Sequence, residues 1–223
     1  MHPRQLAGVV AAVAVAIFLV LTLLVVTGST HGLDSTGFRI AHDLRAPWLD
    51  HTARAVTTLG LIAVVGPAVV AAAVLVRRHR ARAAALVIGC ALAWGSVWIV
   101  KFAVDRPRPP EPLVTTSGAS YPSAHAANSV GWLALALALA ILIPKRAARA
   151  AAVIAGALVM VLVGLSRVYL RAHHLSDVLA GEALAIACYS LALIVSLTWL
   201  DQAAPEPISA TASTSASTSD SSL

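Results

Sequence analysis

The sequence predicts an all-α fold, specifically a polytopic membrane helical bundle with about six transmembrane helices. Hydrophobic residues make up 59% of the 223 residues and charged residues only 12%, with a mean hydropathy of +0.83. A soluble domain carries about 25% charged residues. Six apolar runs approach or reach the roughly 20 residues that a helix needs to cross a bilayer. The chain length suits one domain, which we place at residues 1–200.

The first apolar run follows Arg4 and is too long for the core of a signal peptide. No small-residue cleavage site clearly follows it, so we interpret it as a retained anchor added to the domain. The second run contains Gly66-Pro67, which predicts a kink of the kind that lipid-embedded helices tolerate. A loop over residues 101–122 contains five prolines, through which a helix cannot continue. The expected spans are residues 6–27, 58–76, 83–104, 124–143, a fifth that begins with 150–165, and 177–200.

Two segments lie outside the spans. Residues 28–57 form a polar outer connection, in which Asp34-Ser35 can cap a short interfacial helix that ends at Pro47 and places Trp48 at headgroup level. Residues 201–223 are rich in Ser, Thr and Ala without an apolar period, which predicts a disordered tail. The apolar positions of the interfacial helix are Phe38, Ile40, Ala41 and Leu44.

Basic residues predict the orientation. Outside the candidate site described below, eight lie on one side of the predicted bundle and three, Arg39, Arg45 and Arg54, on the other. Because cytoplasmic loops are enriched in Lys and Arg, both termini are expected in the cytoplasm and loops 101–123 and 166–176 on the extracytoplasmic face. Counting the five basic residues of the candidate site as well makes the two sides equal. The eight are Arg4, Arg77, Arg78, Arg80, Arg82, Lys145, Arg146 and Arg149.

The net charge of +6 does not indicate a nucleic-acid partner, because the basic residues lie mostly at the ends of apolar runs. Membrane topology and an anionic phosphate partner explain them better. Cys90 and Cys188 lie inside apolar runs, and no Cys/His cluster has the spacing of a zinc site. The sequence therefore suggests neither a metal site nor a disulfide framework.

The segment from Ser166 to Asp177 concentrates chemistry, with two Arg, two His and one Asp in twelve residues. Ionisable groups at the end of a membrane helix are candidates for function. His173 and Asp177 are four residues apart, which places them on one helix face, where the carboxylate can hold one imidazole nitrogen as a donor and leave the other free as a nucleophile. The alternative is that Asp177 merely caps the next helix and that the two Arg residues of the segment snorkel to the interface.

A phosphate site follows if the loops on this face converge. Lys101, Arg108 and Arg167 supply three cations, and Ser123 begins a helix whose free N–H groups favour an anion. A phosphate monoester carries about −1.5 to −2 charges at neutral pH. The cations take the role that magnesium has elsewhere, so we expect no metal and no cofactor.

The two candidate histidines have different tasks. His173, paired with Asp177, is expected to attack phosphorus and form a phosphohistidine, while His125 donates a proton to the leaving oxygen. We interpret the remaining polar residues, Asp105, Arg106, Arg171 and His174, as solvated or snorkelling groups. Glu182 lies about 140° around its helix from Asp177, facing away from the His173 side.

Three sequence motifs match a known family, in order along the chain. They are K-x6-R-P at Lys101 and Arg108-Pro109, P-S-x-H at Pro122-Ser123 and His125, and S-R-x5-H-x3-D at Ser166-Arg167, His173 and Asp177. Over roughly residues 30–200 the chain resembles the type 2 phosphatidic acid phosphatase superfamily, the lipid phosphate phosphatases, whose core is shared with the vanadium haloperoxidases. The one departure is Ala124, where the family usually has Gly.

The resemblance implies His173 as nucleophile, Asp177 as its partner, His125 as acid, and a phosphate site of Lys101, Arg108, Ser123 and Arg167. It implies a metal-independent hydrolase of a lipid phosphate monoester or diphosphate, of the undecaprenyl diphosphate, phosphatidic acid or phosphatidylglycerophosphate type. The haloperoxidase branch is disfavoured because those enzymes are soluble. A carrier or transporter that holds the same phosphate without cleaving it is the alternative. The sequence does not indicate an oligomeric state.

Overall fold

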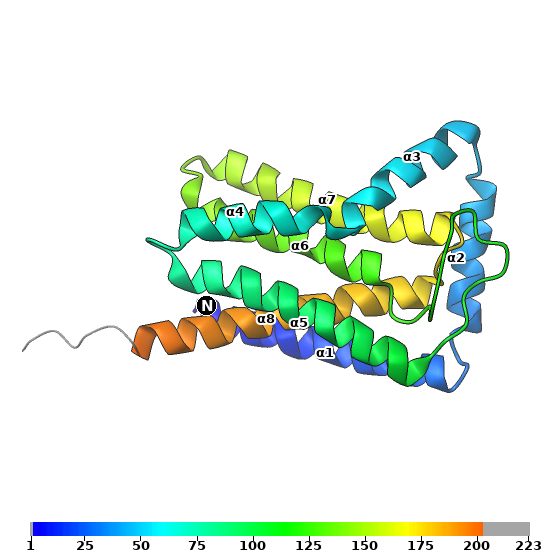
Figure 1. Cartoon of the computed structure of the whole chain (residues 1–223), viewed down its shortest axis with the longest axis horizontal. Helices are drawn as coiled ribbons and strands as arrows, with labels where there is room; N and C mark the ends of the chain where they lie inside the picture. The colour runs from blue at the N-terminus through cyan, green and yellow to red at the C-terminus, as the bar shows by residue number, and fades with distance from the viewer. Residues whose placement is uncertain (1, 203–223) are drawn as a thin grey trace, which may run out of the picture.

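The computed structural model describes residues 2–202, and every regular element among them is helical, as the sequence predicts (Figure 1). The expectation of a disordered tail at 201–223 falls almost wholly outside the described residues, and Asp201 and Gln202 belong to the last helix. The elements are α1 (Pro3–Val26), α2 (His31–Asp43), α3 (Pro47–Thr57), η1 (Thr58–Gly60), η2 (Ile62–Val64), α4 (Val65–Leu75), α5 (Arg80–Val104), α6 (Ala124–Leu139), η3 (Ala140–Leu142), α7 (Arg146–Tyr169) and α8 (Leu175–Gln202).

Five helices are long and apolar enough to cross a membrane, and a bent pair makes up to a sixth span. This agrees with the prediction of about six, but the second span differs from its predicted form. Instead of one helix over 58–76, residues 47–60 and 65–75 form two helical segments bent by 43°. The break precedes Gly66-Pro67, and Pro67 lies in the first turn of α4, where the missing N–H would have no helical partner.

The connection between α1 and the bent pair holds two helices, where one was expected. α2 ends at Asp43, and Pro47 starts α3 as its first residue after Ala46, which has an extended backbone. Proline is favoured at this first position because its φ is preset and its absent N–H is not needed there. The residue that was expected to end one helix therefore begins the next.

α8 is the central helix of the bundle and packs against α5, α1 and α6, while α7 packs against α6 and α3 (Figure 1). Half of the apolar window of α8 is buried inside the protein, against 17% for α1 and α7. The outer helices instead expose Val, Leu and Ile side chains. Such apolar faces are those that a bilayer covers.

The two ends of the bundle are formed by different elements. One end holds the start of α1, the α4–α5 and α6–α7 turns and the end of α8, and the other holds α2, the α5–α6 loop and the α7–α8 turn (Figure 1). The α5–α6 loop starts at Asp105, whose left-handed backbone (φ 42°) ends α5. Lys101 thus belongs to the last turn of α5, within the expected span 83–104, and not to the loop, whose expected range of 101–122 overlapped that span.

Candidate functional site

The seven predicted site residues lie at one end of the bundle, on four helix ends and two connections. α5 and α7 run toward this end and carry their residues in the last turn, whereas α6 and α8 begin there (Figure 1). The residues are Lys101 at the end of α5, Arg108 in the α5–α6 loop, Ser123 and His125 at the start of α6, Arg167 at the end of α7, His173 in the α7–α8 turn, and Asp177 in the first turn of α8.

His173 and Asp177 are close, but not for the reason that their spacing suggested. α8 starts at Leu175, so His173 precedes the helix and the two side chains do not share a helix face. The turn is held by the His173 N–H, which donates to the Arg167 carbonyl at 3.3 Å. His173 Nδ1 then lies 3.5 Å from Asp177 Oδ2, and both side chains are buried. This separation exceeds that of a formed hydrogen bond.

Arg108 defines the protonation of His173. Its Nη1 lies 3.2 Å from His173 Nε2 and donates to the Ala172 carbonyl at 2.8 Å. Because a guanidinium only donates, Nε2 must accept, which leaves the ring proton on Nδ1, facing Asp177. Burial lowers the pKa of His173 to about 4, against the opposing effect of Asp177. The imidazole is therefore neutral at pH 7, with the lone pair of Nε2 directed at the cations.

Lys101 and Arg167, which are both buried, complete a cluster of cations with the half-buried Arg108. Lys101 Nζ donates to the Ala119 carbonyl at 2.6 Å, and Arg167 Nη1 donates to Thr57 Oγ1 at 2.8 Å. Lys101 lies within electrostatic reach of Arg108 and Arg167. Arg167 Nε is buried without a hydrogen-bond partner in the part of the chain that the structure describes. A buried, unpaired donor costs about 1–3 kcal/mol, which an oxygen atom of a bound anion would relieve.

The start of α6 is held directly against α8. Ser123 caps α6, its Oγ accepting from the Ala126 N–H at 3.4 Å, and its own N–H donates to the Asp177 carbonyl at 2.9 Å. The close approach depends on Gly181, where an added Cβ would lie 2.5 Å from the Ser123 carbonyl oxygen. Ala124, the departure from the family motif, is the first residue of α6, and its φ is not positive. The backbone conformation at this position therefore does not require glycine.

His125 follows in the first turn of α6 and is half-buried. It lies within electrostatic reach of His173 and of the three cations. Its backbone packs against η1, since a Cβ on Gly60 would come within 2.8 Å of the His125 carbonyl oxygen. The two imidazoles thus lie at the same end of the bundle, and their roles as acid and nucleophile stay a prediction.

Sequence reasoning missed the groups around Asp177. Asp177 Oδ1 accepts from Arg106 Nη1 at 2.5 Å, and Oδ2 accepts from the Ser120 hydroxyl and from the His174 N–H at 2.9 Å. His174 Nδ1 lies 3.1 Å from the same oxygen. The interpretation of Arg106 and His174 as solvated groups is therefore wrong. Arg106 also contacts Asp34, 72 residues away, a pairing for which the sequence holds no local signal.

The other residues set aside lie outside this network. Arg171 lies over the ring of Phe38, 5.5 Å from its centroid, and Asp105 is exposed. Glu182 faces α7, where a Cβ on Gly164 would come within 2.5 Å of its Oε1.

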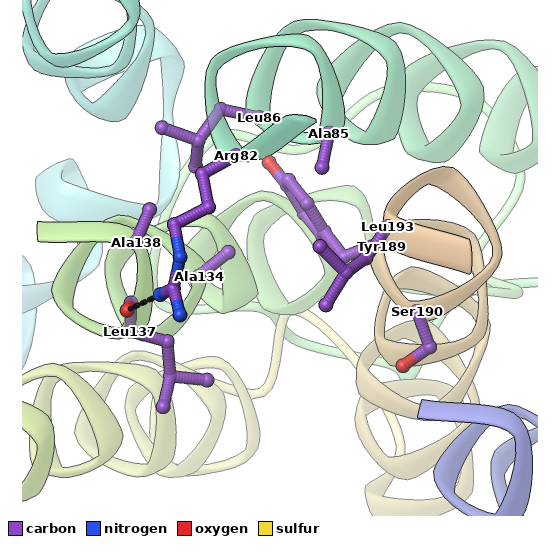
Figure 2. A pocket seen from close by; sticks show the side chains of 9 residues that line it. All are labelled: Arg82, Ala85, Leu86, Ala134, Leu137, Ala138, Tyr189, Ser190 and Leu193. Carbon is purple, nitrogen blue, oxygen red and sulfur yellow. Dashed lines mark hydrogen bonds between the residues drawn. The ribbon is translucent and has the colours of Figure 1, made fainter. Parts of the chain in front are cut away.

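Cavities of different character occupy the two ends. A cavity of about 490 Å³ opens beside the site, and its lining includes Thr30, Asp34, Arg106, Arg108 and His174. A smaller one of about 130 Å³ has nine lining residues, of which Arg82 is the one cation and none is His, Asp or Glu (Figure 2). Arg82 lies in the first turn of α5, and its guanidinium donates to the Leu137 carbonyl at 2.9 Å. Only the first cavity adjoins the predicted chemistry.

The family model of the PAP2 superfamily matches residues 82–201, more than half of the chain and all seven site residues. The chain belongs to the PAP2 superfamily. It is a membrane phosphatase of the lipid phosphate type. Membership of this family favours a phosphatase over the alternative drawn from the sequence, a carrier that binds a lipid phosphate without cleaving it.

Relatives extend the match beyond that segment. Phosphatidylglycerophosphatase B of Bacillus subtilis is 29% identical over 180 residues, covering 78% of this chain and 88% of that protein. The crystal structure of a transmembrane PAP2 type phosphatidylglycerolphosphate phosphatase from Bacillus subtilis superposes with a TM-score of 0.74 at 25% identity, covering 88% of this chain and 98% of that one. Aquifex aeolicus LpxE has the same fold, with a TM-score of 0.58 at 24% identity, covering 74% and 95%.

Proposed function

We propose that this PAP2 enzyme hydrolyses the terminal phosphate monoester of a phospholipid of the phosphatidylglycerophosphate type, through a phosphohistidine on His173. The observation that carries the proposal is the pairing of His173 Nε2 with Arg108 at 3.2 Å while Nδ1 faces Asp177. A neutral imidazole held in this tautomer among cations is suited to attack on an anion.

In the first step Arg108 Nη1 leaves His173 Nε2 and binds a phosphate oxygen. Nε2 attacks phosphorus, the Nε2–P bond forms, and the P–O bond to the lipid breaks. His125 gives its proton to the leaving oxygen, which departs as the lipid alcohol. The positive charge that develops on His173 is stabilised by Asp177.

In the second step a water molecule attacks the phosphohistidine and gives a proton to His125. The Nε2–P bond breaks, inorganic phosphate leaves, and His173 returns to its neutral form. Splitting the hydrolysis into two displacements lowers each barrier, and phosphate-ester hydrolysis is among the slowest uncatalysed reactions.

Lys101, Arg108 and Arg167 bind the phosphate in this scheme, together with Ser123 and the N-terminus of α6. Their three charges match a phosphate monoester of about −1.5 to −2. Fixed cations at the oxygens where charge spreads stabilise the transition state. On this account no metal takes part, so EDTA is expected to leave turnover unchanged.

The substrate class is supported by the relatives and by the cavity beside the site. The curated relative and the solved structure, both from Bacillus subtilis, are named for phosphatidylglycerophosphate. The 490 Å³ cavity has polar groups at the start of α2, namely Thr30, His31 and Ser35, beside apolar ones such as Val25 and Phe38. The polar groups can bind the hydroxyls of a headgroup, whereas an isoprenyl chain offers no group for them to bind. Undecaprenyl diphosphate and phosphatidic acid are the competing substrates.

We also place the site on the extracytoplasmic face, with both termini in the cytoplasm. Eight basic residues outside the site gather at the end of the bundle where α1 starts and α8 ends, which the positive-inside rule assigns to the cytoplasm. Alkaline phosphatase and fluorescent-protein fusions in the α4–α5 and α5–α6 connections test this. Alkaline phosphatase activity in the α4–α5 turn would reverse the orientation.

The function is tested on purified enzyme with a panel of the three lipids, with and without EDTA. We expect the highest kcat/KM for phosphatidylglycerophosphate, and acid-labile ³²P on the protein after rapid quenching without acid. His173→Ala should lose both turnover and label. Full turnover by that variant would refute the mechanism, and a preference for undecaprenyl diphosphate would refute the substrate assignment.

A further inference from the structure

We propose that Arg106 is a positioning residue for the reaction and that Asp34 of α2 holds it in place. This proposal depends on the proposed function, because it concerns the carboxylate that supports His173. It makes α2, which lies outside the segment matched by the family model, part of the catalytic unit.

Arg106 bridges two buried carboxylates with the two arms of its guanidinium. Nη1 donates to Asp177 Oδ1 at 2.5 Å and to Ser176 Oγ at 2.8 Å. Nη2 donates to Asp34 Oδ2 at 2.8 Å and to Thr30 Oγ1 at 3.1 Å. The planar fork of arginine matches this arrangement, and a lysine would supply one point charge in its place.

This bridge determines how the Asp177 carboxylate is oriented. Arg106 takes Oδ1, which leaves Oδ2 for the Ser120 hydroxyl, the backbone of His174 and the ring of His173. If Arg106 were removed, Oδ1 would be a buried, uncompensated acceptor, and the carboxylate would be held through Oδ2 alone, so that its orientation toward His173 would no longer be fixed. Partners that orient a catalytic ligand in this way affect the rate without touching the substrate.

Asp34 is fixed from a second direction. Its Oδ1 accepts from the Ser176 N–H at 2.9 Å, and its Oδ2 accepts from Ser176 Oγ at 3.0 Å. A carboxylate at the N-terminus of α8 is also favoured by the helix dipole. Burial alone would raise the pKa of Asp34, but the hydrogen bonds from Ser176 and Arg106 outweigh it and hold the pKa below its usual value. Asp34 is thus an anion held by Ser176 and Arg106, both of which adjoin Asp177.

The proposal is tested with Asp34→Asn, which keeps the shape of the side chain and removes its charge. The matched control is Asp43→Asn, the same substitution at an exposed position on the same helix. The readouts on full-length enzyme in detergent are kcat and KM for the lipid phosphate, the single-turnover rate of protein phosphorylation, and the Kd for inorganic phosphate.

For Asp34→Asn we expect kcat and the phosphorylation rate to fall together by about 10–100-fold, the usual range for loss of an orienting partner. KM and the Kd for phosphate should stay within about threefold, because the phosphate-binding cations are intact. Arg106→Lys should behave in the same way, and adding Asp34→Asn to it should cost little more, because the two act as one unit.

Two results would overturn this proposal alone. Asp34→Asn turning over at the rate of Asp43→Asn would show that Asp34 does not position the site. If Asp34→Asn weakened the Kd for inorganic phosphate by the same factor as it lowered kcat, Asp34 would support the structure of the whole site and not the position of Asp177 in particular. A wild-type enzyme that releases no phosphate from any lipid would refute the proposed function itself, and this proposal with it.

Discussion

The contact between Gly181 and Ser123 gives a prediction whose size follows from the geometry. In Gly181→Ala the new Cβ would start 2.5 Å from the Ser123 carbonyl oxygen and 3.3 Å from its N and C atoms. An ordinary contact begins near 3.4 Å. The start of α6 must therefore move about 0.9 Å from α8, because backbone atoms cannot rotate away as a flexible side chain would.

A shift of this size separates Ser123 and His125 from the His173–Asp177 side of the site. The hydrogen bond from the Ser123 N–H to the Asp177 carbonyl, now 2.9 Å, would lengthen beyond the usual limit. A 1 Å misplacement of reacting groups can cost about 100-fold in rate. We expect kcat/KM to fall by about that factor, with a loss of about 1–3 kcal/mol in stability from overpacking.

The assay is phosphate release from a lipid phosphate in detergent micelles, with thermal unfolding measured on the same samples. Gly95→Ala is the control, since Gly95 lies in helix α5 and an added Cβ there meets nothing within 4 Å. That variant should keep its activity and gain slightly in stability from helix propensity. Gly181→Ala retaining kcat/KM within twofold of the control would refute the argument that backbone contact between α6 and α8 aligns the site.

Three further predictions concern other contacts. Because the reaction needs neutral His173 and its pKa in the free enzyme is about 4, kcat/KM should persist as the pH falls from 7 to 5 and drop tenfold per unit below 4. The substrate phosphate also titrates, so kcat/KM is first corrected for its ionisation, measured by ³¹P NMR. A fall in the corrected kcat/KM with a midpoint near pH 6.5 would contradict this prediction. Arg108→Lys should lower kcat/KM about 10–100-fold, because it keeps the charge but loses charge-assisted bonds worth about 1.5–3 kcal/mol; unchanged kinetics would mean that the charge alone suffices. Tyr169→Phe removes the hydroxyl that donates to Asp50 Oδ1 at 2.6 Å, so thermal unfolding should show a loss of about 1 kcal/mol with kcat unchanged. A large drop in kcat there would instead tie the packing of α3 to catalysis.

The second span shows where reading apolar runs stops being sufficient. Composition indicated that residues 58–76 would enter the membrane, and a sixth span does exist in bent form. Composition could not show that the helix breaks at residues 58–64. That break is favoured by the packing of Gly60 against the backbone of His125, which is a contact between segments far apart in the sequence. Local propensity is a weak guide where tertiary contacts compensate for lost helical hydrogen bonds.

His173 and Asp177 lie close together, as predicted, but the backbone brings them together by a different route. A separation of four residues suggested one helix face, whereas the chain turns at His173 and the helix starts two residues later. Spacing identified the two partners because both remain close under either backbone path. It could not give the path, which is held by the Arg167 carbonyl from the preceding helix.

By itself the sequence determined the membrane class, a count of about six spans and the motifs of the PAP2 superfamily. These follow from composition and from motifs, which are local along the chain. Only the tertiary structure decided which charge supports which. Arg106 was indistinguishable from a snorkelling cation until Asp34 and Asp177, 72 and 71 residues away, met it on either side. A hydrogen bond depends on separation in space to within a few tenths of an ångström, and distance along the chain does not encode that separation.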